Sequence, residues 1–123
     1  LLIKYIANTY FPGTNIIDVD TVRDINNIAF SSRLTRLSKE SISSASKIYE
    51  TLESIKSEIL KGTSFKKLKE KSIDYLRTND IHVEYLDLRS LITLEEASDK
   101  LKSCGIFIAC HLDDVRLIDN IEI

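Results

Sequence analysis

The sequence contains no methionine or tryptophan, and only three glycines, one proline and two cysteines among its 123 residues. Cys104 and Cys110 both lie in an apolar run, so we expect buried free thiols and a reducing, cytoplasmic location. A strand between them would hold them roughly 20 Å apart, which is too far for a disulfide. The absence of methionine even at position 1, before an apolar opening, predicts a fragment of a longer protein.

Two further absences argue against whole classes of partner. No apolar stretch reaches the roughly 20 residues that a membrane-spanning helix needs, so we expect no membrane partner. The net charge is −2, whereas proteins that bind nucleic acid usually carry a clear excess of basic residues. We therefore expect no nucleic-acid partner, and any basic site must be local.

The chain does contain enough apolar sequence for one hydrophobic core. Hydrophobic residues make up 43% and charged residues 29%, as is typical of a globular domain. The apolar residues of 1–10 have a helical spacing that ends at a Phe-Pro-Gly sequence. Residues 15–19 favour a short strand, and residues 20–28 favour a loop.

The rest of the chain predicts two helices followed by strands. Apolar residues from Ile42 to Ile59 recur at helical spacing, Ser38 can cap this helix, and Gly62 can end it in a left-handed conformation. The other expected elements are a helix from Ser64 to near Asn79, a strand over 81–88, a short helix over 93–101, and strands over 105–112 and 115–123 joined by a turn at Asp113-Asp114. This grouping predicts an α+β fold with helices packed on one face of a small antiparallel three-stranded sheet.

Several reactive or charged groups have simple structural explanations. Cys110 and His111 are adjacent, and neighbouring residues of a strand point to opposite faces, so a nucleophile and base pair is not expected. Together with His82 and Cys104 they lack the clustered spacing of a zinc site, and we expect no metal site. The lysines of 61–71 are typical of a solvated helix face.

The sequence Ser31-Ser32-Arg33 is a different kind of candidate. It combines two hydroxyl groups, consecutive backbone N–H groups and a guanidinium. Arginine offers a fixed fork of donors that matches phosphate oxygens, and small hydroxyl residues let the backbone approach the same charge. The group can bind a polyphosphate, although such a sequence taken alone is more often a surface loop.

Separated segments of the chain resemble the pantothenate synthetase (pantoate beta-alanine ligase) family. Thr-Val-Arg-Asp at 21–24 and Ile-Ala-Phe-Ser-Ser-Arg at 28–33 resemble the family's Thr-Val-Arg-Glu and Met-Ser-Ser-Arg-Asn patterns. Val-Glu-Tyr at 83–85 falls where the family has a Val-Asp-Tyr strand, and Val-Arg-Leu-Ile-Asp-Asn at 115–120 is similar to its Thr-Arg-Leu-Ile-Asp-Asn. The matches keep the family's order and extend over nearly the whole chain.

The resemblance implies the C-terminal part of an enzyme that joins pantoate to β-alanine through a pantoyl adenylate, releasing pyrophosphate and AMP. ATP with Mg²⁺ would be a substrate, and no prosthetic group is implied. Residues 1–20 would end an N-terminal Rossmann-like nucleotidyltransferase domain as a helix and strand. Residues 21–33 would be the hinge and ATP-phosphate loop, and 34–123 the lid domain. The full-length protein would be a homodimer through its N-terminal domain.

By the same resemblance, five residues would contact ATP. Val22 would line the adenine and ribose side, while Phe30, Ser31, Ser32 and Arg33 would cover the phosphates. The family's His-x-Gly-His motif and its pantoate-binding residues would precede the first residue, so this fragment would hold no catalytic residue and would be inactive alone.

Some positions depart from the family pattern. Asn26-Asn27 replaces Asp-Gly, Phe30 replaces Met, and Leu34 replaces Asn, so the loop could have another shape. A noncatalytic α+β interaction domain is therefore the main alternative. A third hypothesis is a nucleic-acid-binding module that uses the lysines of 61–71, and it predicts salt-sensitive binding to RNA or DNA.

Overall fold

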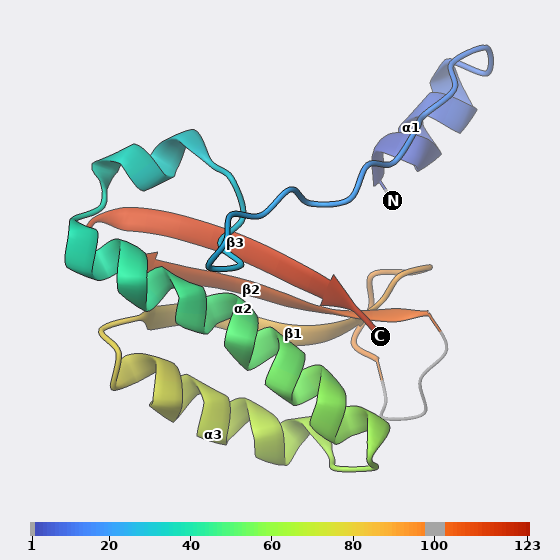
Figure 1. The fold of residues 1–123 in the computed structure, drawn as a ribbon. Coiled ribbons are helices and arrows are strands. Elements are labelled where there is room, and N and C mark those ends of the chain that lie inside the picture. The colour runs from blue at the N-terminus through green and yellow to red at the C-terminus, as the bar shows by residue number, and fades with distance from the viewer. Residues whose placement is uncertain (1, 98–102) are drawn as a thin grey trace.

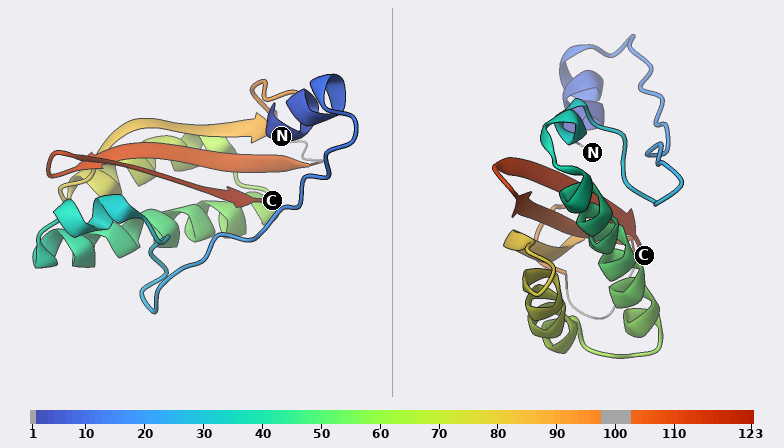
Figure 2. Two further views of the ribbon diagram at one scale, coloured as in Figure 1. Left: turned by 90° about the horizontal axis from the view of Figure 1, so that it is seen from above. Right: turned by 60° about the vertical axis from the view of Figure 1, so that its left-hand side comes forward.

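The computed structural model describes residues 2–97 and 103–123, which form a two-layer α+β fold (Figure 1). Helices α2 (Lys39–Leu60) and α3 (Phe65–Arg77) pack on a sheet of β1 (His82–Ser90), β2 (Cys104–Leu112) and β3 (Val115–Glu122). The strands are antiparallel in the order β1-β2-β3. Views from two further directions show both helices on the same face of the sheet (Figure 2). The predicted fold class is confirmed.

The ends of α2 form as the sequence predicts. Ser38 Oγ accepts a hydrogen bond from the Ser41 backbone N–H at 3.0 Å. Gly62 follows the helix with a φ of 93°, and the Thr63 N–H donates to the Glu58 carbonyl at 2.9 Å. A left-handed glycine with a hydrogen bond of this span is a Schellman cap, which satisfies carbonyls that the helix leaves without partners.

Gly62→Ala should lower the free energy of unfolding by about 1 kcal/mol, because a Cβ disfavours a left-handed backbone. The added Cβ would meet no atom within 4 Å, so the cost would come from the backbone conformation alone. Gly13→Ala is the matched control, since its Cβ also meets nothing within 4 Å and its φ is not positive. Denaturant titrations of the two variants measure the difference, and equal midpoints would contradict this role of Gly62.

The hydrophobic core lies between the two helices and the sheet. Along β2 the residues Ile106, Ile108 and Cys110 are fully buried, as expected for alternate positions that face the helices. The other fully buried large side chains are Leu52, Ile55, Leu76, Ile81, Leu86, Leu112 and Val115. A two-residue turn at Asp113-Asp114 joins β2 to β3, with Leu112 paired to Val115 and Asp113 at a φ of 50°. The predicted hairpin is therefore confirmed.

Two predicted elements do not form in the residues that the structure describes. Residues 15–19 form no strand, and Ile17 and Val19 are 77% and 84% exposed. β-branched residues favour a strand, but a strand needs a neighbour to satisfy its backbone groups, and the described chain supplies none here.

Residues 93–97 form a turn and an isolated bridge instead of the start of a helix over 93–101. The Ala97 N–H donates to the Leu88 carbonyl, and the Leu94 N–H to the Ser90 carbonyl, both at 3.0 Å. These backbone groups are thus bonded to the end of β1 rather than to a helix. Residues 98–101 of the predicted helix lie outside the described residues.

Helix α1 (Leu2–Tyr10) confirms the helix predicted at the start of the chain. An extended segment connects it to the two-layer domain (Figure 1). Ala7 is its buried residue, whereas Leu2, Ile3 and Tyr5 are 62%, 69% and 66% exposed. Its apolar side chains therefore remain largely uncovered by the described chain. None of the described helices has the length and apolar character to cross a membrane.

Candidate functional site

Residues 22–30 form a short hairpin, whereas the sequence predicts a loop over 20–28. The Phe30 N–H donates to the Val22 carbonyl at 3.0 Å, and the Asp24 N–H donates to the Ile28 carbonyl at 2.9 Å. The Asp24 side chain accepts the Ile28 N–H at 2.9 Å, which is how Asp stabilises a turn. Ile28 is 6% exposed and joins the core cluster. The hairpin is thus held by its own hydrogen bonds and by a buried side chain.

Arg23 attaches this hairpin to the two-layer domain. Its Nη1 and Nη2 donate to the two carboxylate oxygens of Asp119 on β3 at 2.7 and 2.8 Å. The guanidinium carbon lies 3.5 Å from the centroid of the Tyr49 ring on α2. The hydrogen bond to Asp119 is the main reason that the pKa of Arg23 is raised. The Arg23 guanidinium, which is planar and permanently charged, thus contacts a carboxylate and an aromatic face, the two kinds of partner that guanidinium groups prefer.

The predicted phosphate loop follows the hairpin directly. Ser31 is the N-cap of the 3₁₀ helix η1 (Ser32–Arg36), and its Oγ accepts the Arg33 N–H at 3.2 Å. The Leu34 N–H donates to the Ser31 carbonyl at 3.1 Å. This helix was not predicted from the sequence. One of the backbone N–H groups expected to face a phosphate, that of Arg33, donates instead to the Ser31 hydroxyl oxygen. The Ser31 hydroxyl proton is still available to a ligand.

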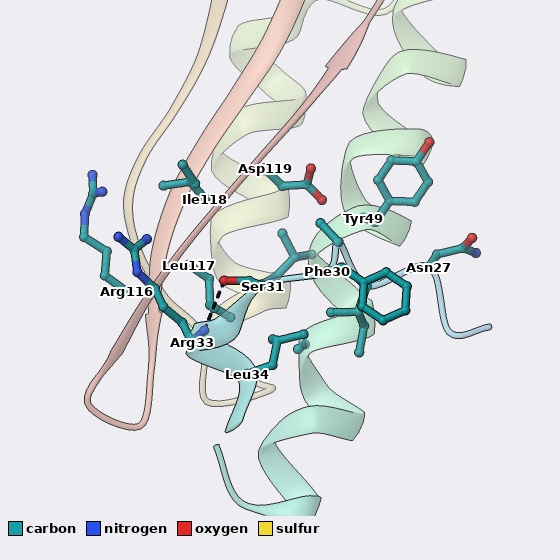
Figure 3. Close-up of a pocket in the computed structure, with 14 residues that line it drawn as sticks. Asn27, Phe30, Ser31, Arg33, Leu34, Tyr49, Arg116, Leu117, Ile118 and Asp119 are labelled. Carbon is teal, nitrogen blue, oxygen red and sulfur yellow. Dashed lines mark hydrogen bonds between the residues drawn. The ribbon is translucent and has the colours of Figure 1, made fainter. Parts of the chain in front are cut away.

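A cavity of about 260 Å³ lies between this loop, α2 and β3 (Figure 3). The charged residues that line it are Arg33, Arg116 and Asp119. Asp119 is paired with Arg23, and Arg116 Nε donates to the Glu84 carboxylate at 2.7 Å. That hydrogen bond lowers the pKa of Glu84 and raises the pKa of Arg116. Within residues 2–97 and 103–123 the Arg33 guanidinium has no ion-pair partner, so it is the uncompensated charge of the cavity wall.

The structure brings together part of the predicted ATP site. Phe30, Ser31 and Arg33 line the cavity, and Val22 and Ser32 do not. Val22 is 64% exposed and lies beside Phe30, which is 67% exposed, through their backbone hydrogen bond. The assignment of these five residues to ATP binding remains a prediction.

Sequence reasoning gave no role to four residues that shape this site. Arg23, Arg116 and Asp119 belong to the segments that resemble the ligase family, but the resemblance assigns none of them a contact with ATP. Tyr49 was interpreted only as part of the apolar helix face. The contact of Arg23 with Asp119 joins residues 96 positions apart, a pairing that no local pattern indicates.

The other candidate groups do not form reactive clusters. Cys110 is 0% exposed, whereas His111 is exposed and lies 3.4 Å from the Glu84 carboxylate. The two side chains therefore face opposite sides of the strand, as the sequence predicts. Cys104 and Cys110 are both buried, as the apolar run around them predicts. No group of three His, Cys, Asp or Glu side chains in the described residues is arranged to hold a metal ion.

Burial raises the pKa of Cys110 from 9.0 to about 12. At pH 8 the folded protein should therefore hold about a thousandfold less Cys110 thiolate than the unfolded chain. We expect a thiol reagent to modify Cys110 only upon unfolding, and a Cys104→Ala variant assigns the signal to this residue. The same shift removes stability as pH rises above 9, because the unfolded thiol then ionises while the folded thiol keeps its proton. Rapid modification of the folded variant at pH 8 would contradict this.

The lysine-rich face is partly engaged within the domain. Lys69 Nζ lies 3.1 Å from the Asp87 carboxylate on β1, and Lys61 Nζ lies 2.8 Å from the Glu58 carboxylate. Two of its lysines are therefore ion-paired. The expectation that this face does not bind nucleic acid remains a prediction.

The same fold occurs in crystal structures of pantothenate synthetases. The enzyme from Thermus thermophilus matches with a TM-score of 0.85 at 26% identity, over 98% of this chain and 44% of the other. A pantoate-beta-alanine ligase from Francisella tularensis, complexed with beta-gamma ATP and beta-alanine, matches with a TM-score of 0.62 at 29% identity, over 98% and 38%. The fold class is thus that of a substantial part of these ligases.

The sequence comparisons lead to the same family. The model of the pantoate-beta-alanine ligase family matches residues 1–122. A pantothenate synthetase of Nitrosospira multiformis is 31% identical over 99% of this chain and 44% of its own length. The chain belongs to the pantoate-beta-alanine ligase family. It spans less than half the length of these relatives.

Proposed function

We propose that this chain is the ATP-closing lid of a pantothenate synthetase, an enzyme that condenses pantoate and β-alanine at the expense of ATP. The observation that carries the proposal is Arg33, an arginine without an ion-pair partner in the described residues, on a cavity wall beside the Ser31 hydroxyl. A guanidinium and a hydroxyl are donors suited to phosphate oxygens. Family membership and the ATP-type ligand of the Francisella relative support the same assignment.

In the proposed reaction, a carboxylate oxygen of pantoate attacks the α-phosphorus of ATP and pyrophosphate leaves. The amine of β-alanine then attacks the carbonyl carbon of pantoyl adenylate, and AMP leaves. Arg33 and Ser31 would donate to the oxygens that gain negative charge as pyrophosphate departs, which lowers the barrier of the first step. Closure of the lid would exclude water from the reactive adenylate. Mg²⁺ would enter with ATP as substrate.

The other assigned residues would complete the nucleotide contacts. Val22 is exposed and would offer an apolar surface to the base and ribose, and its exposed neighbour Phe30 would help to cover the phosphates. Ser32 adds a hydroxyl at the start of η1. All of these residues bind and orient, and none acts as a nucleophile.

The chain would then have three parts. Residues 1–20 would close an N-terminal nucleotidyltransferase domain, and the exposed apolar residues of α1 support this because that domain would cover them. Residues 21–33 would be the hinge and phosphate loop, and 34–123 the lid. Catalytic histidines and dimer contacts would belong to the N-terminal domain of a cytoplasmic homodimer.

Pantoate-dependent exchange of pyrophosphate into ATP tests the proposal. The full-length protein should catalyse this exchange only when pantoate is present, and residues 1–123 alone should not catalyse it. β-Alanine should then convert the adenylate to pantothenate and AMP. Absence of exchange in a folded full-length protein would reject the ligase and favour a noncatalytic interaction domain.

A further inference from the structure

The Arg23–Asp119 ion pair differs from the other pairs in the described residues by its burial. The two side chains are only 14% and 8% exposed, whereas the next most buried pair, Arg89 with Asp87, is 33% and 22% exposed. Both carboxylate oxygens are used, and the Tyr49 ring covers the guanidinium. Such a bidentate, desolvated contact has a defined geometry, unlike most surface ion pairs.

Backbone hydrogen bonds connect Arg23 to the phosphate loop. Arg23 forms an antiparallel bridge with Ala29, and its Nη1 donates to the Asn27 carbonyl at 3.1 Å. Ala29 directly precedes Phe30, whose N–H is bonded to the Val22 carbonyl. A shift of Arg23 would therefore move both strands of the hairpin and the loop that follows.

Asp119 also lines the cavity in which Arg33 would meet a polyphosphate. A carboxylate there opposes the binding of an anion unless a cation compensates it, and Arg23 supplies that cation. By charge alone, Asp119→Asn should strengthen ATP binding. If the pair instead holds the loop in place, the same substitution should weaken catalysis, so the two effects have opposite signs.

We infer that Arg23 and Asp119 are positioning residues that fix the loop 30–33 over the nucleotide phosphates. The inference rests on the proposed function, in which this loop binds ATP. Arg23 acts on the reaction through Arg33 and the loop, without contact to the reacting atoms.

The first test compares Asp119→Asn with Asp87→Asn in the full-length protein. Asp87 also accepts hydrogen bonds from two cationic side chains, Lys69 and Arg89, but it lies on β1 away from the loop. Asp119→Asn should lower the kcat of pantoate-dependent exchange by about tenfold to a hundredfold, the usual penalty for a misplaced group. Asp87→Asn should change thermal stability at most. Unchanged or improved exchange in Asp119→Asn would overturn the inference.

A double-mutant cycle tests whether the effect passes through Arg33. In an Arg33→Ala background, Asp119→Asn should cause little further loss, because the loop no longer carries the group to be positioned. Full additivity of the two losses would reject this route. If Arg33→Ala alone leaves the exchange rate unchanged, the proposed role of this loop in ATP binding is rejected. If Arg33→Ala lowers the rate and Asp119→Asn does not, only the positioning role is rejected.

Hydrogen–deuterium exchange gives a readout that does not depend on activity. The amides of Asp24 and Phe30 should exchange about tenfold faster in Asp119→Asn than in the unmodified protein, since local opening governs their exchange. Asp87→Asn should leave the peptide spanning 21–31 unchanged. If this peptide is equally protected from exchange in both variants, the positioning role is refuted, whether or not the protein sample is active.

Discussion

Arg33→Ala should lower the rate of pantoate-dependent ATP–pyrophosphate exchange by about 10²-fold to 10³-fold, the range found when one preorganised transition-state donor is removed. Arg33 is the charged residue of the cavity wall without an ion-pair partner in the described chain, so its removal leaves no internal carboxylate unpaired. The folded structure should therefore persist. Initial rates at saturating ATP and pantoate, together with a thermal melt, measure both expectations.

Arg36→Ala provides the matched control for this prediction. Arg36 lies in the same η1 helix, is exposed, and does not line the cavity. It removes the same charge from the same segment, so a similar loss in both variants would point to a general electrostatic effect and reject a specific role for Arg33. Arg33→Lys should be intermediate, because lysine keeps the charge but loses the fork of donors.

Leu52→Ala should lower the free energy of unfolding by about 2–5 kcal/mol, the cost of removing a buried leucine side chain that the surroundings cannot replace. Leu52 lies on α2 and is 0% exposed, in the core between the helices and the sheet. Several kcal/mol is a large part of the stability of a small domain. Denaturant unfolding followed by circular dichroism measures the change.

Leu60→Ala is the control for this second prediction. Leu60 lies near the end of the same helix and is 67% exposed, so the same atoms are removed with little loss of packing. Its effect should stay within about 0.5 kcal/mol, as for most surface substitutions. Comparable destabilisation by both variants would mean that α2 does not pack on the sheet as described.

The elements with strong local signals were predicted well. The helical spacing from Ile42 to Ile59 and the cap at Ser38 defined α2, and the Asp113-Asp114 turn defined the β2–β3 hairpin. These features depend on nearby residues, whose periodicity and turn chemistry are visible in the chain. Residues 15–19 show the opposite case, because β-branched residues indicate a strand only where a neighbouring strand is present.

The candidate site was predicted only in part, for a related reason. The chemistry of Ser31 and Arg33 could be inferred from their side chains and from the family resemblance. Two ion pairs, Arg23 with Asp119 and Arg116 with Glu84, depend on the sheet register and on the packing of the hairpin. No spacing in the sequence indicates which of these arginines has a partner. The structure is therefore needed to show that Arg33, unlike Arg23 and Arg116, has no ion-pair partner in the described residues.

The bonded hairpin before the loop has a consequence for the entropy of nucleotide binding. Fixing the backbone of one residue costs about 1–2 kcal/mol, so a four-residue loop that became ordered only around ATP would lose several kcal/mol of affinity. Here the Phe30 N–H donates to the Val22 carbonyl and the Arg33 N–H to the Ser31 hydroxyl oxygen, so both groups are bonded within the chain. We expect these internal bonds to order the loop as the domain folds, so that the proposed contacts of Arg33 contribute more fully to holding the phosphates.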